Sequence, residues 1–420
     1  MIDKRQKRIL ILALFAGELM MRSGAEIYRV EDTVTRICRA CKINYVECFA
    51  INTGIIVSLD SGDEESDVFT FIKRTRNSQI NLERVSLIND FSRVFTTTSL
   101  SVEAGFQRLR EIAATPGYSM LWRVIGAILI GAFFCPLYKG SFSDMFIAGA
   151  ISGVTWLVSY AISLLRFADF IRILVSCMAA AGLVLFAAAL GAGDSISPVV
   201  VAATTIFLPG VAITNCARDF LSGDMLAGGT RLAETAMAAV AIAAGVGIGI
   251  RIWIMLGGEL GGDRAVEFTP PWFLLFGFFS TAGFCLLFNC PKRLIAPVST
   301  IGAIGMFLLQ FLTPTSGMIS ACFFGTCAIA ILAEFAARIF KDATTIFIIP
   351  GIIPFVPGVP LYQTMSNMLV GNYSESASIG VEALIIAGSI AIAIVLVATF
   401  SRLTFAVGRR IRRHGQTPPC

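Results

Sequence analysis

Long stretches without a single charged side chain constrain this chain more than any other feature. Four segments contain no Lys, Arg, Asp or Glu: 173–193, 195–217, 271–290 and 294–333. About 20 apolar residues cross the hydrocarbon core of a bilayer as a helix. As one helix the last segment would be roughly 60 Å long, at about 1.5 Å per residue, so we expect two spans separated near Thr313–Gly317. The chain is therefore predicted to be a polytopic α-helical membrane protein.

The first 116 residues have a different character from the rest. They hold 16 of the 33 Lys and Arg residues and 15 of the 28 Asp and Glu residues. Helical periodicity covers 4–42, strand-like alternation covers 45–60 and 68–73, and two amphipathic helices are expected over 81–95 and 101–114. We predict four parts: an α+β domain (1–116), a first membrane repeat (117–260), a second membrane repeat (261–405) and a basic tail (406–420).

Ten spans are expected in the membrane part, and the basic residues between them set their orientation. The spans lie near 121–138, 145–165, 170–191, 196–216, 229–256, 271–290, 294–312, 316–337, 344–363 and 379–402. Loops on the side of the N-terminal domain hold Arg166, Arg172, Arg218, Arg231, Lys292, Arg293, Arg338 and Lys341, whereas the opposite loops hold Lys139, Arg251 and Arg264. Because basic residues favour the cytoplasmic side, we expect both termini in the cytoplasm.

Composition also excludes several classes of function. The single histidine, His414, lies in the tail, so a His-dependent nucleophile is not expected. Cys38-x-x-Cys41 has no second pair, so we predict no metal site. We predict no catalytic residues, no cofactor and no enzyme activity. The N-terminal domain is nearly neutral, which argues against nucleic acid, and the Arg409–Arg413 tail is expected to meet anionic lipids.

One segment that interrupts an apolar region with Pro-Gly occurs twice. Residues 208–224 read LPGVAITNCARDFLSGD, and 356–372, a distance of 148 further on, read VPGVPLYQTMSNMLVGN. At the same spacing Glu234 meets Glu382. We interpret this as duplication of a five-span unit, and because five is odd the two copies must be inverted. Thr344–Phe347 also resembles Thr204–Phe207 at a different offset, which suggests a short insertion near Pro350.

Inverted repeats in transporters place the substrate near the midplane, on interrupted helices. Pro and Gly interrupt a helix and expose backbone groups that are tolerated only against protein or a water-filled cavity. A half-helix N-terminus suits a carboxylate, and freed carbonyls suit an ammonium group. The candidate substrate-binding residues are Pro209, Gly210, Asn215, Pro357, Gly358 and Gln363. For Asn215 and Gln363 the alternative is hydrogen bonding between helices.

Acids within spans are costly and are therefore candidates for function. Glu234 and Glu382 are the candidate proton-coupling residues; the alternative is an acid in the first helical turn, with Glu234 reaching Arg231. Arg218, Asp219 and Asn367 are candidate gating residues, and the alternative for them is a solvated loop.

Several segments resemble the bacterial threonine/serine exporter family. Residues 16–32, AGELMMRSGAEIYRVED, are similar to its N-terminal signature. Residues 208–219 with Ser222-Gly223-Asp224 and Gly228-x-x-Arg231 resemble its first membrane signature, and 349–351 with Pro354-x-x-Pro357-Gly358 and Tyr362 resemble the second. The resemblance covers nearly the whole chain. It implies ten spans in the bacterial inner membrane, a cytoplasmic N-terminal domain, and export of L-threonine and L-serine driven by protons.

The substrate is left open among related chemistries. A split relative is associated with dicarboxylate (succinate) export, but two carboxylates would need two electropositive sites and the membrane half has few cations. This favours small amino acids, which need one anion-binding and one cation-binding feature. A passive channel or a sensor is the alternative from another class, and a homo-oligomer remains open.

Overall fold

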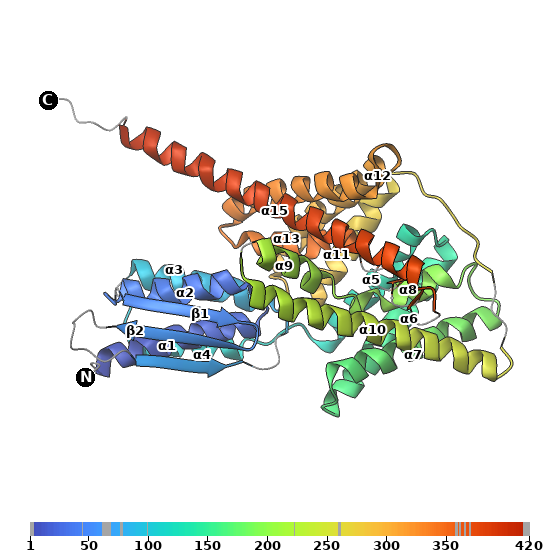
Figure 1. Cartoon of the computed structure of the whole chain (residues 1–420), viewed down its shortest axis with the longest axis horizontal. Helices are drawn as coiled ribbons and strands as arrows, with labels where there is room; N and C mark the ends of the chain where they lie inside the picture. The colour runs from blue at the N-terminus through green and yellow to red at the C-terminus, as the bar shows by residue number, and fades with distance from the viewer. Residues whose placement is uncertain are drawn as a thin grey trace.

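A small α+β domain lies at one end of the computed structural model and a bundle of apolar helices at the other (Figure 1). The structure describes residues 4–43, 45–60, 69–75, 79–98, 100–221, 223–258, 262–357, 360, 363–364, 367–368 and 371–414, without the side chains of 60, 211, 214, 217, 218, 402 and 404–414. Gly358, Tyr362 and residues 415–420 of the tail therefore lie outside the described residues.

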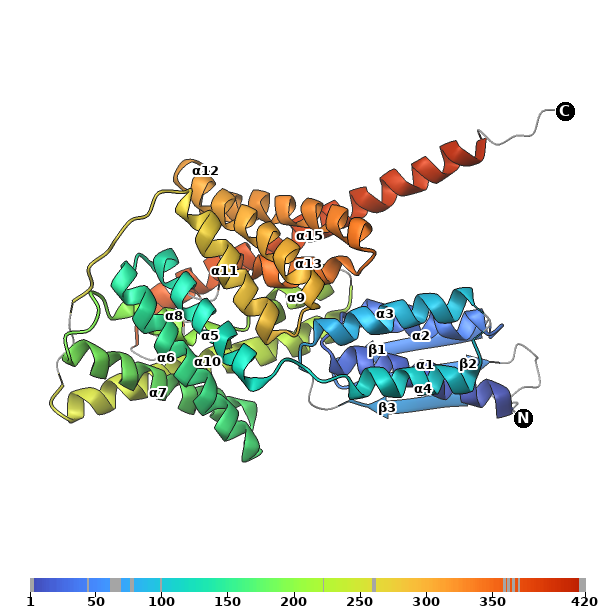
Figure 2. The same ribbon diagram turned by 180° about the vertical axis from the view of Figure 1, so that it is seen from behind.

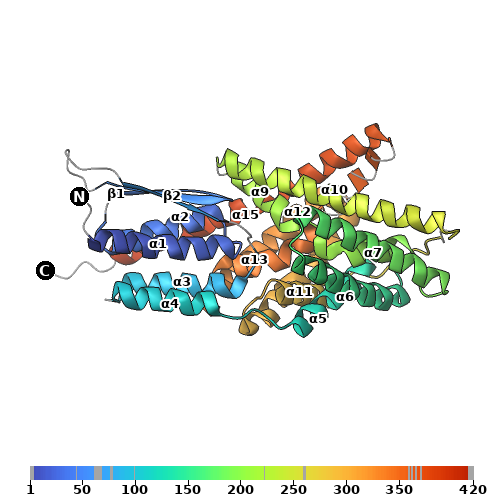
Figure 3. The ribbon, with the colours of Figure 1, turned by 90° about the horizontal axis from the view of Figure 1, so that it is seen from below.

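The N-terminal domain has the elements that the sequence periodicity predicts. They are α1 (Lys4–Arg22), α2 (Ile27–Ala40), β1 (Tyr45–Ile51), β2 (Gly54–Asp60), β3 (Phe69–Arg74), α3 (Leu82–Thr97) and α4 (Val102–Ala114). The strands form an antiparallel sheet in the order β1-β2-β3, with Phe49 opposite Ile56 and Ile56 opposite Ile72. Figure 3 shows three layers: the sheet, then α1 and α2, then α3 and α4.

Alternation along the strands decides which face of the sheet meets the helices. Ile55, Val57 and Leu59 of β2 are buried and join a core that includes Leu10 of α1 and Val30 of α2. Residues 56 and 58 between them point away from this core. A strand with period-two hydrophobicity buries one face only, so the domain folds on one side of its sheet.

Ten helices and four 3₁₀ turns are described in the membrane part. They are α5 (Met120–Phe134), η1 (Cys135–Tyr138), α6 (Phe142–Leu164), α7 (Asp169–Ala189), α8 (Ser197–Thr204), η2 (Thr205–Phe207), α9 (Gly210–Leu221), α10 (Met225–Met255), α11 (Trp272–Leu287), η3 (Lys292–Leu294), α12 (Ile295–Phe340), α13 (Thr344–Ile352), η4 (Ile353–Phe355) and α15 (Tyr373–His414), of which α9 is the least apolar. Six helical stretches of the described chain are long and apolar enough to cross a membrane, and three more are apolar but shorter. The chain is therefore a polytopic helical membrane protein.

The longest helix contains the break expected from its length. Helix α12 runs from Ile295 to Phe340, but Gly317 has φ 77° and ψ 163°, outside the helical region. Only glycine adopts this backbone conformation without strain. The interruption lies at the end of the Thr313–Gly317 segment, and it divides α12 into two pieces of about span length.

Helices α7 and α10 approach each other closely. A Cβ atom on Gly245 would lie 2.3 Å from the carbonyl oxygen of Leu174, and one on Gly249 would lie 2.7 Å from that of Met178. No larger residue fits at either position without moving the helices apart. Such small residues four apart allow close helix packing in membranes.

Helices α10 and α15 run in opposite directions. Ala227, in the first turn of α10, packs into the core of the N-terminal domain, so α10 starts at that end. Ser401 of α15 forms hydrogen bonds with Glu334 and Arg338, near the end of α12 that also faces this domain. Figures 1 and 2 show α10 leading away from the N-terminal domain and α15 leading back past it.

Candidate functional site

The two Pro-Gly segments interrupt their helices with the same backbone geometry. Helix α8 ends at Thr204, the turn η2 covers Thr205–Phe207, and Leu208 is extended (φ −58°, ψ 125°). In the second copy α13 ends at Ile352, the turn η4 covers Ile353–Phe355, and Val356 is extended (φ −67°, ψ 133°). Every one of these positions is 148 residues from its counterpart (352 minus 204, 356 minus 208).

The hydrogen bonds of the two interruptions also match. The Leu208 N–H donates to the carbonyl of Thr205, and the Val356 N–H donates to that of Ile353, both at 3.1 Å. Pro209 and Pro357 follow, and neither has an N–H to continue a helix. The register of 148 holds from the end of α13 through the turn, on the C-terminal side of Pro350, so the insertion that the Thr344–Phe347 resemblance suggests near Pro350 stays a prediction.

The two interruptions meet in space. A Cβ atom on Gly210 would lie 3.2–3.3 Å from the side-chain carbons of Val356. Glycine lets the first residue of α9 approach the second break closely. The structure thus brings Pro209 and Gly210 beside the residue that precedes Pro357, as expected for two halves of one site.

The corner after each interrupted helix is also repeated. Gly223 and Gly371 have φ +89° and +91°, and their N–H groups donate to residues 220 and 368. Asp224 and Asn372 donate to the carbonyls of Asp219 and Asn367, both at 2.9 Å. This pair of bonds with a left-handed glycine is the Schellman C-cap. The matched corners place Asp219 and Asn367 at equivalent positions.

A side chain crosses each corner between the same two positions, but with donor and acceptor exchanged. Cys216 Sγ donates to the carbonyl of Gly228 at 3.2 Å, and Ser376 Oγ donates to that of Thr364 at 2.7 Å. Residues 364 and 376 are the counterparts of 216 and 228. Each contact joins the interrupted helix to the long helix after it.

The charges at the two corners differ. Asp219 Oδ2 lies 3.0 Å from Arg231 Nε, and both side chains are largely buried, with exposed fractions of 12% and 14%. Arg231 thus pairs with Asp219 rather than with Glu234. At the equivalent positions the second copy has Asn367 and Ile379, which cannot form an ion pair. The ion pair is present only at the corner near the N-terminal domain.

The other candidate substrate residues and the gating candidate Asn367 lie around the interruptions with unequal exposure. Asn215, in the second turn of α9, is buried with 9% of its surface exposed, whereas Gln363 is exposed and Asn367 is half-buried. Gly358 and the side chain of Arg218 lie outside the described residues. A buried amide on the broken helix can bind a substrate or a neighbouring helix.

The two candidate proton carriers occupy matching positions. Glu234 follows the first residue of α10 by nine positions, and Glu382 follows the first residue of α15 by the same number. Both are exposed, and neither carboxylate forms a hydrogen bond or ion pair with a residue that the structure describes. They belong to antiparallel helices. The structure gives no contact that joins them to each other.

Sequence reasoning missed Arg231 as a site residue. Its signals are its place in the Gly228-x-x-Arg231 part of the first membrane signature and its position 12 residues after Asp219. It also missed Asp342, which joins the N-terminal domain to the membrane part. Arg29 lies in the N-terminal signature, and the sequence leaves open whether it packs the domain or couples it to the pore. Its Nη1 donates to Thr345 Oγ1 at 2.7 Å.

Comparisons with known proteins agree with the segments quoted from the sequence. A family model for threonine/serine exporters matches residues 11–253, and a second, described as "Threonine/Serine exporter, ThrE", matches 274–400. An uncharacterized protein of Haemophilus influenzae is 30% identical over 100 residues, 23% of this chain. The match spans only 33% of that relative's length. No solved structure matches the chain.

Proposed function

The chain belongs to the threonine/serine exporter family, and from this premise we propose that it exports small amino acids, L-threonine and L-serine, in exchange for protons. Members of this family are transporters, which supports a role other than catalysis. The observation that carries the proposal is the contact of Gly210 with Val356, where two interrupted helices meet. Such a junction offers backbone groups to a polar solute inside a membrane.

We propose ten spans arranged as two inverted repeats. Division of α12 at Gly317 gives seven spans from six candidates, and α11 and the two interrupted helices add three. The matched backbone at a spacing of 148 supports duplication, and the opposite directions of α10 and α15 support inversion. The N-terminal domain and the end of α15 lie on one side, which we assign to the cytoplasm of a bacterial inner membrane, as the basic loops favour.

The proposed binding site recognises the zwitterion common to amino acids. The N-terminus of α9 at Pro209 and Gly210 provides a positive dipole end for the carboxylate. Backbone carbonyls at the second break, next to Pro357 and Gly358, accept from the ammonium group. Asn215 and Gln363 are assigned to the polar side chain of the substrate. Neither side chain carries a positive charge, which disfavours binding of a dicarboxylate.

Proton coupling is assigned to Glu234 and Glu382, and gating to Arg218, Asp219 and Asn367. A carboxyl that alternates between lipid-covered and wet surroundings changes its proton affinity, because burial disfavours the charged form. The positions of the two acids on antiparallel helices would let one act near each face of the membrane. Asp219 with Arg231 would close the face near the N-terminal domain. The basic tail would hold that face to anionic lipids.

The test is efflux of labelled threonine from proteoliposomes. We expect saturable efflux that unlabelled threonine and serine inhibit, that succinate does not inhibit, and that an imposed pH gradient accelerates. Inhibition by succinate alone would assign the dicarboxylate instead. Efflux that does not saturate would indicate a passive channel.

Variants separate proton coupling from transport. Glu234→Gln and Glu382→Gln should each lower efflux driven by the pH gradient by at least about tenfold, which is about 1.4 kcal/mol in the barrier. Glu375→Gln is the matched control, because Glu375 lies exposed in the first turn of the same helix as Glu382. Wild-type rates in both test variants would remove these acids from the mechanism.

A further inference from the structure

The N-terminal domain is fastened to the second membrane repeat by the start of α3. The N–H groups of Leu82 and Glu83 donate to the carbonyls of Phe288 and Asn289, at 2.9 and 2.8 Å. The first N–H groups of a helix have no partner within it, so the loop between α11 and α12 completes this helix. Leu82 itself packs into the core of the second repeat. The attachment is therefore both polar and apolar.

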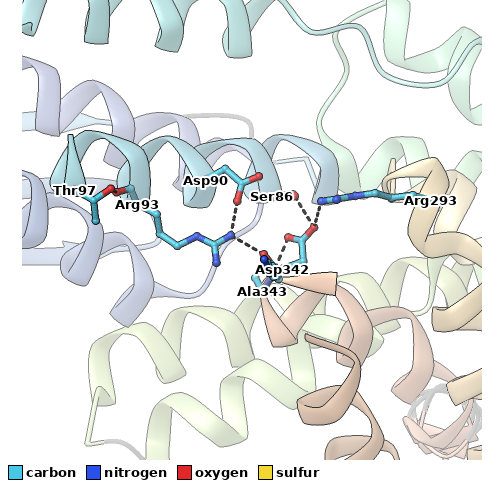
Figure 4. A network of polar contacts seen from close by, with 8 residues as sticks. Ser86, Asp90, Arg93, Thr97, Arg293, Asp342 and Ala343 are labelled. Carbon is cyan, nitrogen blue, oxygen red and sulfur yellow. Dashed lines mark hydrogen bonds and ion pairs between the residues drawn. The ribbon is translucent and has the colours of Figure 1, made fainter. Parts of the chain in front are cut away.

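A buried carboxylate makes a second attachment along α3 (Figure 4). Asp342, between α12 and α13, has a fully buried side chain. Its Oδ2 accepts from Ser86 Oγ and from Arg293 Nη2, both at 2.8 Å, and its Oδ1 accepts from the Ala343 N–H at 3.0 Å. A buried charge that loses its donors is strongly destabilised. Breaking the contacts of Asp342 would therefore cost much free energy.

Two arginines complete the attachment. Arg93 of α3 pairs with Asp90 and donates to the carbonyl of Lys341 at 2.6 Å. Arg29 of α2 donates to Thr345 in the first turn of α13. The domain thus holds the loops on both sides of α12 and the start of α13. All of the membrane residues that the domain contacts in this attachment belong to the second repeat.

Among the described residues, the polar contacts of the domain with α10 of the first repeat are fewer and more exposed. Asn52, at the turn between β1 and β2, donates from Nδ2 to Thr230 Oγ1 at 3.0 Å in an exposed position. Ala227 packs against the domain core, and Glu31 faces Asp224, a like charge. Thr230 directly precedes Arg231, which pairs with Asp219. The weak contact therefore lies beside the proposed gate.

Alternating access requires the parts of a transporter to move against each other at each face. At this face the contacts that break when the transporter opens must be those that cost the least free energy to break. We infer that the N-terminal domain is a moving part of the exporter, carried by α12 and α13, and that its β1–β2 turn restrains the α9–α10 corner holding the Asp219–Arg231 ion pair. The inference rests on the proposed function, since only a transporter must open this corner.

The restraint acts on one face of the membrane only. The equivalent corner of the second copy, at Gly371, carries Asn367 and Ile379 in place of the ion pair. It lies at the opposite end of the bundle from the N-terminal domain, where α15 begins (Figure 2). The two faces would therefore open with unequal ease.

Paired cysteines test which contact moves. Asn52→Cys with Thr230→Cys ties the turn to α10, and Arg29→Cys with Thr345→Cys, the matched control, ties the domain to α13. A short bifunctional thiol reagent closes each pair, and peptide mass spectrometry verifies it. The background replaces with Ser the three half-buried cysteines, Cys41, Cys48 and Cys327, and Cys420 of the tail.

We expect the 52–230 cross-link to lower threonine efflux at least tenfold and cleavage of the reagent to restore it, whereas the 29–345 cross-link leaves efflux within twofold. Unchanged efflux with the 52–230 link would overturn the inference. So would equal inhibition by both links, or failure of the 52–230 pair to cross-link.

A distance measurement separates failure of the inference from failure of the proposed function. Spin labels at the exposed Arg110 of α4 and Ile339 of α12 should give one narrow distance in lipid nanodiscs. Labels at Arg110 and the exposed Met237 of α10 should give a broader distribution. This readout needs no substrate. Equal widths would refute a domain carried by the second repeat even if threonine is exported, and the expected widths would uphold it even if another solute is exported.

Discussion

Two buried carboxylates hold loops together at opposite ends of the membrane bundle. Asp342 accepts from Ser86, Arg293 and Ala343 at the end that meets the N-terminal domain. Asp144, also fully buried, accepts from the backbone N–H groups of residues 141, 194 and 195. A buried carboxylate persists only when several donors satisfy it. Each of these acids therefore determines the position of loops that are distant in sequence.

Replacement of Asp342 should weaken the junction between the domain and the membrane bundle. In Asp342→Asn one acceptor oxygen becomes an amide donor, which leaves either both Ser86 and Arg293 or the Ala343 N–H without an acceptor. We expect the free energy of unfolding to fall by about 1–3 kcal/mol, measured as a lower melting temperature in detergent. Asp90→Asn is the control, because that exposed pair with Arg93 is worth at most about 1 kcal/mol. Equal effects of the two variants would contradict this role for Asp342.

Glu31 makes the stability of the junction depend on pH. Burial raises the pKa of its carboxyl above the ordinary value of 4.5, the Ala50 N–H lowers it in part, and Asp224 raises it further. The ionised form is thus less stable in the folded protein than in the unfolded chain. The destabilisation is absent below pH 4.5, grows between the ordinary and the raised pKa, and is complete above the raised value.

Glu31→Gln should therefore stabilise the protein at neutral pH and lose its effect in acid. Glutamine keeps an oxygen that can accept from Ala50 but carries no charge beside Asp224. Melting curves across pH should show the largest gain well above the raised pKa and none below 4.5. Glu47→Gln on the exposed face of β1 is the control. A gain that persists unchanged into acid would contradict the electrostatic cause.

At the scale of elements, local pattern predicts much of what the structure contains. Periodicity predicts the helical region 4–42, though not its division into α1 and α2, and places the strands to within a few residues, and the Pro-Gly pairs predict both interruptions. Contacts between distant elements follow from packing and leave little trace in the sequence. The approach of Gly210 to Val356 and the pairing of Asp219 with Arg231 are of this kind. The attachment of α3 to the second repeat is also a contact that the sequence does not reveal, because the residues of α3 have the pattern of an ordinary amphipathic helix.

Gly210→Ala should impair transport by separating the two interruptions. Its new methyl group would lie 3.2–3.3 Å from the Val356 side chain, which is too close for relaxed contact. We expect efflux to fall roughly 3- to 10-fold, or about 0.7–1.4 kcal/mol in the transport barrier. Val356→Ala in the same chain removes the opposing methyl groups and should restore most of the rate.

Gly182→Ala in α7 is the matched control, because a Cβ there meets nothing within 4 Å. It should transport at the wild-type rate. Rescue that fails in the Gly210→Ala, Val356→Ala double variant would show that the loss at position 210 has another cause than contact with Val356.

At the scale of the whole molecule, one arrangement accounts for the Pro-Gly interruptions and the polar residues, which destabilise a helix within a membrane. In the proposed arrangement, two copies of a broken and a long helix, fastened by matching corners, approach each other from opposite directions so that their interruptions meet. The N-terminal domain lies over one end only and carries its attachments on the second copy. Sequence spacing predicts the duplication and the odd number of spans predicts the inversion, but neither reveals which copy carries the domain.

The sidedness of the two corners tests this arrangement most directly. Met225 and Tyr373 are equivalent first residues of α10 and α15, 148 apart, and both are exposed. Each would be replaced by cysteine and treated with a membrane-impermeant thiol reagent in intact cells and in inverted vesicles. Inverted repeats predict that Tyr373→Cys reacts only in intact cells and Met225→Cys only in inverted vesicles. Reaction of both from the same side would contradict the account.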